Sequence, residues 1–438
     1  MKYDIGIVGL GYVGLTFATA LADLGFSVLG IEKRKDIVDL TNSGKPHFSE
    51  AGLESIMRHV TRSGQLKAVQ ALTPEDECDI YVITVGTPLD ENGNAQLDYI
   101  RSATREVADN MPDGALVILR STVKIGVSRN VVKPILEESG KSFHIAMCPE
   151  RTLEGRAMQE LRQLPQIVGA DDAETRDRAV RFFYQLTRSV VQVGSLETAE
   201  IIKLVDNTYR DVQFGFANEV ARICDVFGVN ANEVISGGKF GYPRTDVALP
   251  GLVGGPCLEK DPHILTQSLA EMDVALDITP AARAVNENQP AETVRFIADR
   301  LSDRDRPAIA LLGMAFKGIP ATNDLRGSMS LKVLAALRAQ IPDADIRLYD
   351  PVCSHAELRE VADGATIVDS RSDAIAGADC MIIANNHPDF GAIPPVELRE
   401  QLAEGGFIFD YWNHFSSHHP HEVGDAYYAV GNLRKAYR

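Results

Sequence analysis

Residues 3–14, Tyr-Asp-Ile-Gly-Ile-Val-Gly-Leu-Gly-Tyr-Val-Gly, decide the fold of this chain. Residues 3–9 form an apolar run that predicts a buried strand, and a Gly-x-Gly-x-x-Gly turn and a helix over 12–23 follow it. Such glycines let the backbone approach a pyrophosphate at the N-terminus of the helix. We therefore predict a dinucleotide site, whose cofactor-binding residues are Gly9, Gly11, Tyr12, Val13 and Gly14.

The next predicted strand, 26–31, ends at Glu32, about 20 residues beyond the glycine turn, where an acid can bind ribose hydroxyls. A carboxylate there would repel a 2′-phosphate, so we expect NAD as the cofactor and not NADP. Lys33 and Arg34 follow directly and weaken that preference.

Alternation of apolar runs with helical segments predicts a parallel, doubly wound sheet, with further strands at 80–85, 116–119, 144–147 and 191–193. Residues 195–227 contain no proline and a single glycine, and their apolar spacing predicts one long helix followed by shorter helices to about residue 288. A second alternating unit begins near residue 306, with strands predicted at 308–313, 346–349, 366–368, 380–384 and 407–410. In it, Ser328 is expected to cap a helix that runs to residue 339.

These patterns predict an α/β protein in which two doubly wound, Rossmann-like domains are joined by a long central helix and a helical middle domain. The predicted domains are residues 1–195, 196–290 and 300–438, with candidate linkers at 290–292 and 302–307.

Charge and composition exclude some classes of partner. Asp plus Glu is 61 and Lys plus Arg is 44, and the net charge of −17 argues against nucleic acid or an anionic membrane. The six cysteines show no paired spacing, so we expect reduced thiols in a cytoplasmic protein. We also expect no signal peptide and no membrane-spanning helix, since no run of about 18 apolar residues occurs.

A cysteine lies in the turn Gly254-Gly-Pro-Cys257-Leu-Glu-Lys-Asp261-Pro. If a helix begins after the turn, Cys257 and Asp261 share one of its faces, and a thiol at a helix start gains thiolate character. A dinucleotide site and a poised thiol together suggest oxidation to the acid level, because the thiol can capture an aldehyde and let a second hydride leave. The alternative is a small buried hydrophobic side chain.

Two further pairs have the spacing of residues on one helical face. Lys203 and Asn207 lie on the predicted long helix, where most such pairs are simply solvated. Glu150 and Glu154 follow a strand end, where parallel sheets bind ligands, although acids in the first turn of a helix are a serious alternative.

Three other features have similar alternatives. Thr122 also follows a strand, where a threonine can simply cap a helix. Lys317 and Arg326 flank a loop that leads to a helix N-terminus, which suits a phosphate but also suits a charged surface loop. The four histidines near the C-terminus lack ligand spacing, so we expect a solvated loop and no metal; they are His414, His418, His419 and His421.

Taken together, these residues resemble the UDP-glucose/GDP-mannose dehydrogenase family over essentially the whole chain. The segments that carry the resemblance are GLGYVG (9–14), VGTP (85–88), RSTV (120–123), CPERTLEG (148–155), EIIKLVDNTYRDV (200–212), GGPCLEKD (254–261) and GMAFK…NDLRGS (313–328). Arg120 stands where a lysine is frequent in the family, and Pro256 where serine or histidine is more usual.

The resemblance implies an NAD-binding N-terminal domain, a central helix that dimerises and a C-terminal domain that binds the UDP part of a nucleotide sugar. Cys257 is similar to the family nucleophile, and the residues implied to act with it are Lys203, Asn207, Asp261, Glu154, Glu150 and Thr122. Thr87 and Thr122 fall at cofactor positions. The implied substrate contacts are Glu150, Arg151, Lys203, Asn207, Gly254, Lys317 and Arg326.

The reaction implied is a four-electron oxidation of the sugar C6 alcohol. An aldehyde forms, the Cys257 thiolate adds to it, a second hydride transfer leaves a thioester, and a water held by Glu154 or Asp261 releases the uronate. Lys203 and Asn207 would stabilise the oxyanion.

The substrate is expected to be UDP-GlcNAc or UDP-ManNAc, because segments 148–151 and 386–390 look like the N-acetylhexosamine branch. UDP-glucose is the alternative favoured by segment 258–261, and GDP-mannose a distant third. A two-electron dehydrogenase of the same build and a non-catalytic NAD and nucleotide-sugar sensor remain open.

Overall fold

The computed structural model describes residues 2–91, 93–415 and 426–433. The chain forms two compact units. One comprises the chain up to Asp206 together with His263–Ala275, and the other comprises Asn207–Pro262 and the chain from Leu276 onward. Within the described residues, no helix combines the length and the apolar character needed to cross a membrane.

The sheet of the first unit has the strand order β3-β2-β1-β4-β5-β6-β7-β8. Its strands are β1 (Lys2–Val8), β2 (Val28–Ile31), β3 (Leu66–Val69), β4 (Glu77–Ile83), β5 (Ala115–Leu119), β6 (Phe143–Met147), β7 (Gln166–Gly169) and β8 (Val190–Val193). The order from β3 to β6 is that of a dinucleotide-binding sheet, which confirms the predicted doubly wound fold.

The sheet is not parallel throughout, and in this the prediction was wrong. Strand β7 pairs antiparallel with β6 at Met147 and Gly169, and β8 then continues parallel to β7. Strands β3 and β7 were not predicted.

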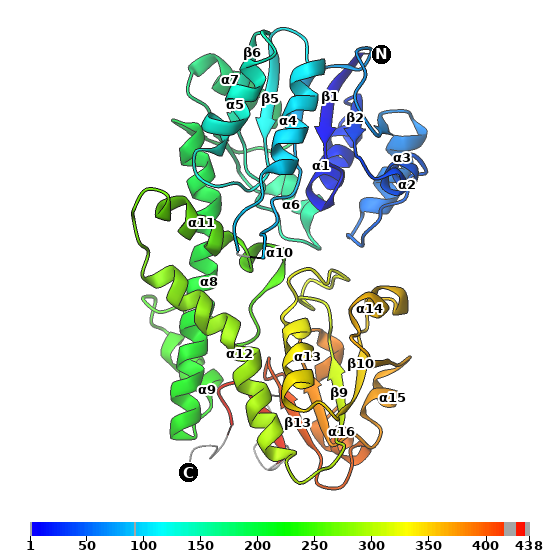
Figure 1. Cartoon of the computed structure of the whole chain (residues 1–438), viewed down its shortest axis with the longest axis vertical. Coiled ribbons are helices and arrows are strands. Elements are labelled where there is room, and N and C mark those ends of the chain that lie inside the picture. Colours follow the sequence, from blue (N-terminus) through cyan, green and yellow to red (C-terminus); the bar gives the residue numbers. More distant parts are fainter. Residues whose placement is uncertain (1, 92, 416–425, 434–438) are drawn as a thin grey trace. The chain divides into compact units, whose positions relative to one another are not determined.

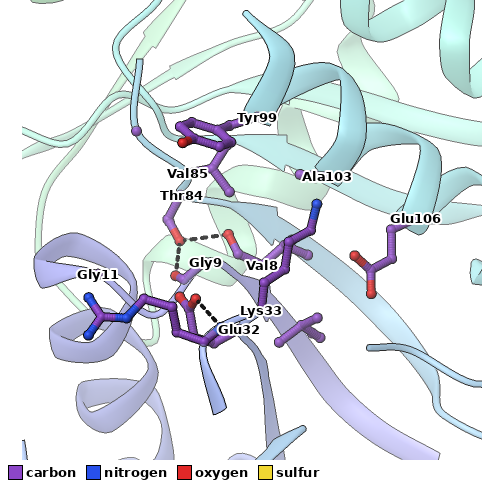
Figure 2. Close-up of a pocket in the computed structure, with 13 residues that line it drawn as sticks. Val8, Gly9, Gly11, Glu32, Lys33, Thr84, Val85, Tyr99, Ala103 and Glu106 are labelled. Carbon is purple, nitrogen blue, oxygen red and sulfur yellow. Dashed lines mark hydrogen bonds between the residues drawn. The ribbon is translucent and has the colours of Figure 1, made fainter. Parts of the chain in front are cut away.

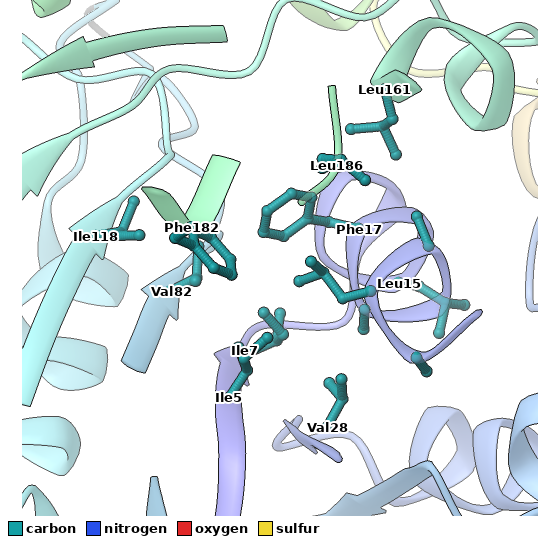
Figure 3. Packing of buried hydrophobic residues seen from close by; sticks show 14 of the residues in the cluster. Ile5, Ile7, Leu15, Phe17, Val28, Val82, Ile118, Leu161, Phe182 and Leu186 are labelled. Carbon is teal, nitrogen blue, oxygen red and sulfur yellow. The ribbon is translucent and has the colours of Figure 1, made fainter. Parts of the chain in front are cut away.

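Helices cover both faces of this sheet. They are α1 (Tyr12–Asp23), α2 (Lys35–Asn42), α3 (Leu53–Arg62), α4 (Asp98–Asn110), the π-helical turn η1 (Ser128–Val132), α5 (Lys133–Glu137), α6 (Ala157–Gln163) and α7 (Ala173–Phe183). One core lies under α1, α3, α6 and α7, where Phe17 and Phe182 pack near Ile5, Ile7 and Val82 (Figure 3). The other core lies under α4, η1 and α5. Burial on both faces explains why the strands are nearly continuous apolar runs.

The predicted long helix is α8 (Leu196–Phe227), which runs without interruption (Figure 1). It is followed by α9 (Ala231–Lys239), α10 (Gly255–Leu258), α11 (Asp261–Ala270) and α12 (Ile278–Arg300). Helix α12 passes through the buried Pro290, so the predicted linker at 290–292 is wrong. Burial of the surrounding residues outweighs the missing N–H of this proline.

The second sheet has the order β11-β10-β9-β12-β13-β14, with every pair parallel. Its strands are β9 (Ala308–Leu312), β10 (Asp345–Tyr349), β11 (Thr366–Ile367), β12 (Cys380–Ile383), β13 (Phe407–Asp410) and β14 (Tyr427–Ala429). The helices are α13 (Met329–Gln340), α14 (His355–Val361), α15 (Arg371–Ile375), the 3₁₀ turn η2 (Pro388–Gly391) and α16 (Pro395–Gln401). Alternate residues of β9 face two different cores, as a doubly wound sheet requires.

Candidate active site

The turn between β1 and α1 has the backbone that its glycines demand. Gly9 has φ +93°, and a Cβ on Gly14 would lie 1.8 Å from the Gly9 carbonyl oxygen, so neither position accepts a side chain. A Cβ on Gly11 would meet nothing within 4 Å. The backbone at Gly11 is therefore open to a ligand at the start of α1, which fits a pyrophosphate.

A cavity of about 320 Å³ opens beside this turn, at the carboxyl ends of β1, β2 and β4 (Figure 2). Gly9, Glu32, Val85 and Tyr99 are among the residues that line it. The Thr84 hydroxyl donates to the carbonyls of Val8 and Gly9 at 3.0 and 2.7 Å, which ties the end of β4 to the glycine turn. Open α/β sheets bind dinucleotides at this place, at the carboxyl ends of the strands.

Glu32 is held at the rim of this cavity by the backbone. Its two carboxylate oxygens accept the N–H groups of Leu10 and Arg34, each at 3.0 Å. The two cations beside it are already engaged, since Lys33 Nζ donates to Ser102 Oγ at 2.6 Å and the Arg34 guanidinium lies 2.5 Å from Asp36. A 2′-phosphate would be repelled by the Glu32 carboxylate. Lys33 and Arg34 could not readily offset this repulsion, because both are already bound to other side chains, so the site favours NAD.

The ends of β4 and β5 are joined by Thr87, whose hydroxyl donates to the Thr122 carbonyl at 2.6 Å. The structure thus brings together two of the residues predicted to contact the cofactor, both within the first unit. Val13 lies in the first turn of α1.

Glu150 lies buried in the loop after β6, where both its oxygens are occupied. Arg120 Nη2 donates to Oε2 at 2.6 Å, while the N–H groups of Arg151 and Thr152 donate to Oε1 at 2.7 and 2.8 Å. Burial alone would raise the pKa of Glu150, but the Arg120 guanidinium and the two N–H donors outweigh it and lower that pKa below its ordinary value. Glu150 is thus an ionised anchor of this loop.

Arg120 is the partner that sequence reasoning missed. Its guanidinium is enclosed by the Phe17 and Phe183 rings, whose centroids lie 4.4 and 5.4 Å from its Cζ, and it also donates to the Cys148 carbonyl at 3.1 Å. The sequence placed Arg120 after a strand and in the RSTV segment, but neither signal pointed to Glu150 as its partner.

The loop that carries Glu154 is joined to the glycine turn. The Gly155 N–H donates to Glu50 Oε2 at 2.7 Å and to the Tyr12 hydroxyl at 3.0 Å, and Tyr12 donates to the same carboxylate. Burial and this carboxylate raise the pKa of Tyr12 above its ordinary value. Glu50 was not predicted, because nothing in its loop sequence marks it.

Arg151, predicted to contact the substrate, is engaged within the first unit. Its guanidinium donates to the Pro165 carbonyl at 2.7 Å and to Asp206 at 3.2 Å.

Lys203 and Asn207 are buried on α8, one helical turn apart, and Lys203 is only 7% exposed. Asn207 Nδ2 donates to Asp261 Oδ2 at 2.6 Å, and Lys260 Nζ lies 2.9 Å from the other oxygen of Asp261, which is fully buried. The NH₂ group of Asn207 carries two N–H donors, and this hydrogen bond uses one of them. One N–H of that NH₂ group therefore remains for another acceptor.

Cys257 lies in α10, a single turn that begins after Gly254, and it is the one exposed cysteine of the six. Asp261 begins a separate helix, α11, so the predicted common helical face is wrong. Pro262 explains the break, because it has no N–H to donate to the Leu258 carbonyl. The five buried cysteines contrast with Cys257; burial raises the pKa of the Cys148 thiol, for example, to about 12.

The cysteine turn rests on the loop between β9 and α13. The Gly255 N–H donates to the Gly327 carbonyl at 2.7 Å, and Gly254 lies so close that a Cβ there would be 2.4 Å from the same oxygen. This loop carries the predicted phosphate contacts: Lys317 Nζ lies 5.1 Å from the Phe316 ring centroid, and Arg326 pairs with Asp324 at 2.5 Å. Ser328 caps α13 as predicted.

The predicted site residues thus fall into two groups, one in each unit. The first unit contains the dinucleotide cavity. Apart from the cavity, its predicted site residues are Thr87, Thr122, Glu150, Arg151, Glu154 and Lys203. Those of the second unit are Asn207, Gly254, Cys257, Asp261, Lys317 and Arg326. The expected solvated loop is wrong for His414, whose side chain is only 11% exposed and whose Nδ1 lies 2.9 Å from the buried Asp410. His418, His419 and His421 lie outside the described residues.

Comparison with known proteins matches three family models in the order predicted. They are the NAD binding, central and UDP binding domains of the UDP-glucose/GDP-mannose dehydrogenase family, which match residues 3–187, 197–288 and 310–417.

Relatives of similar length carry the resemblance across the whole chain. A UDP-N-acetyl-D-mannosamine dehydrogenase of Pyrococcus horikoshii is 32% identical over 89% of this chain and 90% of its own, and one of Campylobacter jejuni is 33% identical over 88% and 95%. Among solved structures, a UDP-D-ManNAc dehydrogenase of P. horikoshii has a TM-score of 0.87 at 30% identity, and a UDP-glucose dehydrogenase of Pyrobaculum islandicum has 0.88 at 25%. The first match covers 99% of this chain and 99% of the solved one, and the second covers 98% of each.

The NAD cavity, the order of the domains and these relatives agree. The chain belongs to the UDP-glucose/GDP-mannose dehydrogenase family, and it is an NAD-dependent oxidoreductase that acts on a CH–OH group of a nucleotide sugar.

Proposed function

We propose that this protein oxidises the C6 alcohol of a UDP-N-acetylhexosamine, with UDP-N-acetyl-D-mannosamine as the first choice, to the uronate. The observation that carries the proposal is Cys257, the one exposed thiol, set in a turn that is fixed by its neighbours in the second unit. A nucleophile that binds the aldehyde covalently prepares it for the second hydride loss, and an exposed thiol is such a group.

In the proposed mechanism, NAD bound beside the glycine turn would supply the hydride acceptor, with one NAD used in each of the two oxidations. Lys203, or a water beside it, takes the proton of the C6 hydroxyl. The Cys257 thiolate then adds to the aldehyde carbon, and the carbonyl oxygen takes a proton to give a thiohemiacetal. Loss of a second hydride and that proton leaves a thioester, which water hydrolyses to the carboxylate and the free thiol.

Several residues would assist these steps. Lys203 is buried, and its Nζ would donate to the oxyanion. The second N–H of Asn207, whose first N–H is bound to Asp261, would donate to the same oxygen. Because Glu150 is already an ionised anchor and Asp261 is fully buried, Glu154 is the better candidate to hold the hydrolytic water. Thr87 and Thr122 would contact the nicotinamide side of the cofactor.

The choice of sugar rests on the relatives, several of which bear the name UDP-N-acetyl-D-mannosamine dehydrogenase. UDP-glucose is the second candidate, because the P. islandicum UDP-glucose dehydrogenase has nearly the same TM-score as the mannosamine enzyme. In either case the UDP part would bind near Gly254, Lys317 and Arg326, at the end of β9.

The test is the NADH formed per sugar consumed, measured with UDP-ManNAc, UDP-GlcNAc, UDP-glucose and GDP-mannose. We expect two NADH per UDP-ManNAc, and uronate formation that is lost in Cys257→Ser. Cys353→Ser, at a buried cysteine, serves as the matched control and should keep the ratio of two. One NADH per sugar in the unaltered protein, or uronate formation that survives Cys257→Ser, would refute the mechanism.

We also propose that the protein is a homodimer that forms through α8. Apolar side chains stand exposed along this helix at helical spacing, with Phe216 at 54%; the others are Tyr209, Ile223 and Phe227. A contiguous exposed apolar patch of this kind is typical of a protein–protein interface.

Two coarser expectations complete the proposal. The domains 1–195, 196–290 and 300–438 are supported by the three family matches, which fall inside or close to these bounds. A cytoplasmic location is supported by the cysteines, all of which are free.

A further inference from the structure

Arg283, on α12, is 2% exposed and binds the backbone on both sides of Cys257. Its Nη1 donates to the Leu258 carbonyl at 2.8 Å, and its Nη2 donates to the Val253 carbonyl at 2.9 Å. One planar guanidinium therefore spans the turn in which the thiol sits. The five donors of this group have a fixed geometry, so the two carbonyls are held at a set separation.

The Leu258 carbonyl needs this donor because of the sequence that follows. In a continuing helix it would accept from residue 262, which is a proline and has no N–H. A buried carbonyl without a partner is costly, and Arg283 supplies the partner. Arg283 therefore supplies the hydrogen bond that the helix loses at Pro262. We call its two hydrogen bonds, to the carbonyls of Val253 and Leu258, the Arg283 clamp.

Arg283 is itself held by a buried polar network between α8 and α12. Asp211 Oδ1, on α8, accepts from Arg283 Nη1 at 2.6 Å, and Asn286 Nδ2 donates to the same oxygen at 2.9 Å. Asn286 Oδ1 accepts from Asn218 at 2.9 Å. Asn218 in turn makes two hydrogen bonds with the backbone of Gly251, at 3.0 and 3.1 Å. The segment before and after the thiol is therefore fixed at three points.

We propose that Arg283 is a positioning residue, which fixes the backbone around Cys257 so that the thiolate meets the aldehyde carbon. This inference rests on the proposed function. In the step concerned, the thiolate lone pair forms the S–C bond, the carbonyl π pair moves to oxygen and that oxygen takes a proton. Such additions need the reacting atoms about 3–3.5 Å apart, and a shift of about 1 Å can cost a hundredfold in rate.

The first oxidation does not use the thiol. Loss of the Arg283 clamp should therefore slow the second oxidation and leave the first unchanged. The aldehyde still forms, but its capture slows, and NADH per sugar falls from two toward one while free aldehyde appears. A general loss of folded protein has a different signature, because it lowers all rates together and leaves the ratio at two.

The test compares Arg283→Lys with the control Arg222→Lys. Lysine at 283 keeps a cation for Asp211 but cannot bridge two carbonyls. Arg222 also links α8 to α12, through Glu292 at 2.8 and 2.9 Å, but it is exposed and its hydrogen bonds do not involve the turn. Three quantities are measured: NADH per sugar, aldehyde trapped by hydroxylamine, and the rate and pH profile of Cys257 alkylation by iodoacetamide.

We expect uronate formation to fall about a hundredfold in Arg283→Lys, with KM nearly unchanged, trapped aldehyde and an altered alkylation profile. Arg222→Lys should behave as the unaltered protein. A folded Arg283→Lys protein with two NADH per sugar and an unchanged alkylation profile would overturn the proposal. If Arg283→Lys does not fold, Asn218→Ser, which releases Gly251 and Asn286 but leaves Arg283 in place, decides the question, and an unchanged alkylation profile there also overturns it.

Failure of the proposed function would look different. The unaltered protein would then give one NADH per sugar, whereas the effect of Arg283→Lys on alkylation, which requires no turnover, would remain.

Discussion

The stability of the first unit depends on the side chain of Arg120. It is fully buried, pairs with Glu150 and lies over two aromatic rings. Arg120→Met would leave the Glu150 carboxylate buried without its counter-charge, so we expect a loss of about 3–5 kcal/mol in the free energy of unfolding, measured by urea denaturation. The double variant Arg120→Met, Glu150→Gln should recover part of this loss. An equal loss in single and double variants would show that the charge is not the cause.

Asp225 is a buried carboxyl on α8 that titrates near neutral pH. Burial raises its pKa to about 7, although it accepts the Leu433 N–H at 2.9 Å. Because the folded protein binds this proton more tightly than the unfolded chain, the group stabilises the fold most below pH 4, and that stabilisation is lost as the pH rises toward 7.

The corresponding prediction concerns Asp225→Asn, which stays neutral and still offers an oxygen to Leu433. Relative to the unaltered protein, its free energy of unfolding should rise by about 2 kcal/mol between pH 5 and pH 8. Denaturant titrations at the two pH values measure this change. A difference between the two proteins that does not vary with pH would contradict the assigned titration.

At the scale of an element, the cysteine turn depends on Gly255. Its φ is +89°, and a Cβ there would lie 2.4 Å from the Phe316 ring. Gly255→Ala should therefore shift the turn and lower uronate formation. Gly241→Ala is the control: its φ is +68° and an added Cβ would meet no atom within 4 Å, so it should cost only backbone strain of about 1–2 kcal/mol. Steady-state rates and melting temperatures of the two variants distinguish them. Equal activity in both would mean that the turn tolerates a side chain.

For the whole molecule, the prediction is the oligomeric state. Sedimentation velocity should show a dimer, and Phe216→Asp, which introduces a charge into the exposed apolar stripe of α8, should weaken it by about 2 kcal/mol or roughly thirtyfold in Kd. Val396→Asp is the matched control, because Val396 is similarly exposed but lies on α16. A dimer unaffected by Phe216→Asp would place the interface elsewhere.

The sequence by itself determined the features that depend on neighbouring residues. The glycine turn needs a positive φ at Gly9 and no side chain at Gly14, and Glu32 follows its strand directly, so both could be recognised in the printed letters. The same holds for the long helix, whose apolar spacing persists for many turns, whereas the sequence left open whether Cys257 is buried, and the structure shows it exposed.

Only the tertiary structure decided which distant groups meet. The partners of Glu150 and of the Leu258 carbonyl are Arg120 and Arg283, 30 and 25 positions away, and no local pattern marks either contact. The antiparallel pairing of β7 with β6 also cannot be read from the sequence, because the short segment Gln166–Gly169 suits a strand in either direction. A buried polar group or an open strand edge must form hydrogen bonds. Which partner lies close enough depends on how the whole chain packs, and local sequence does not encode that packing.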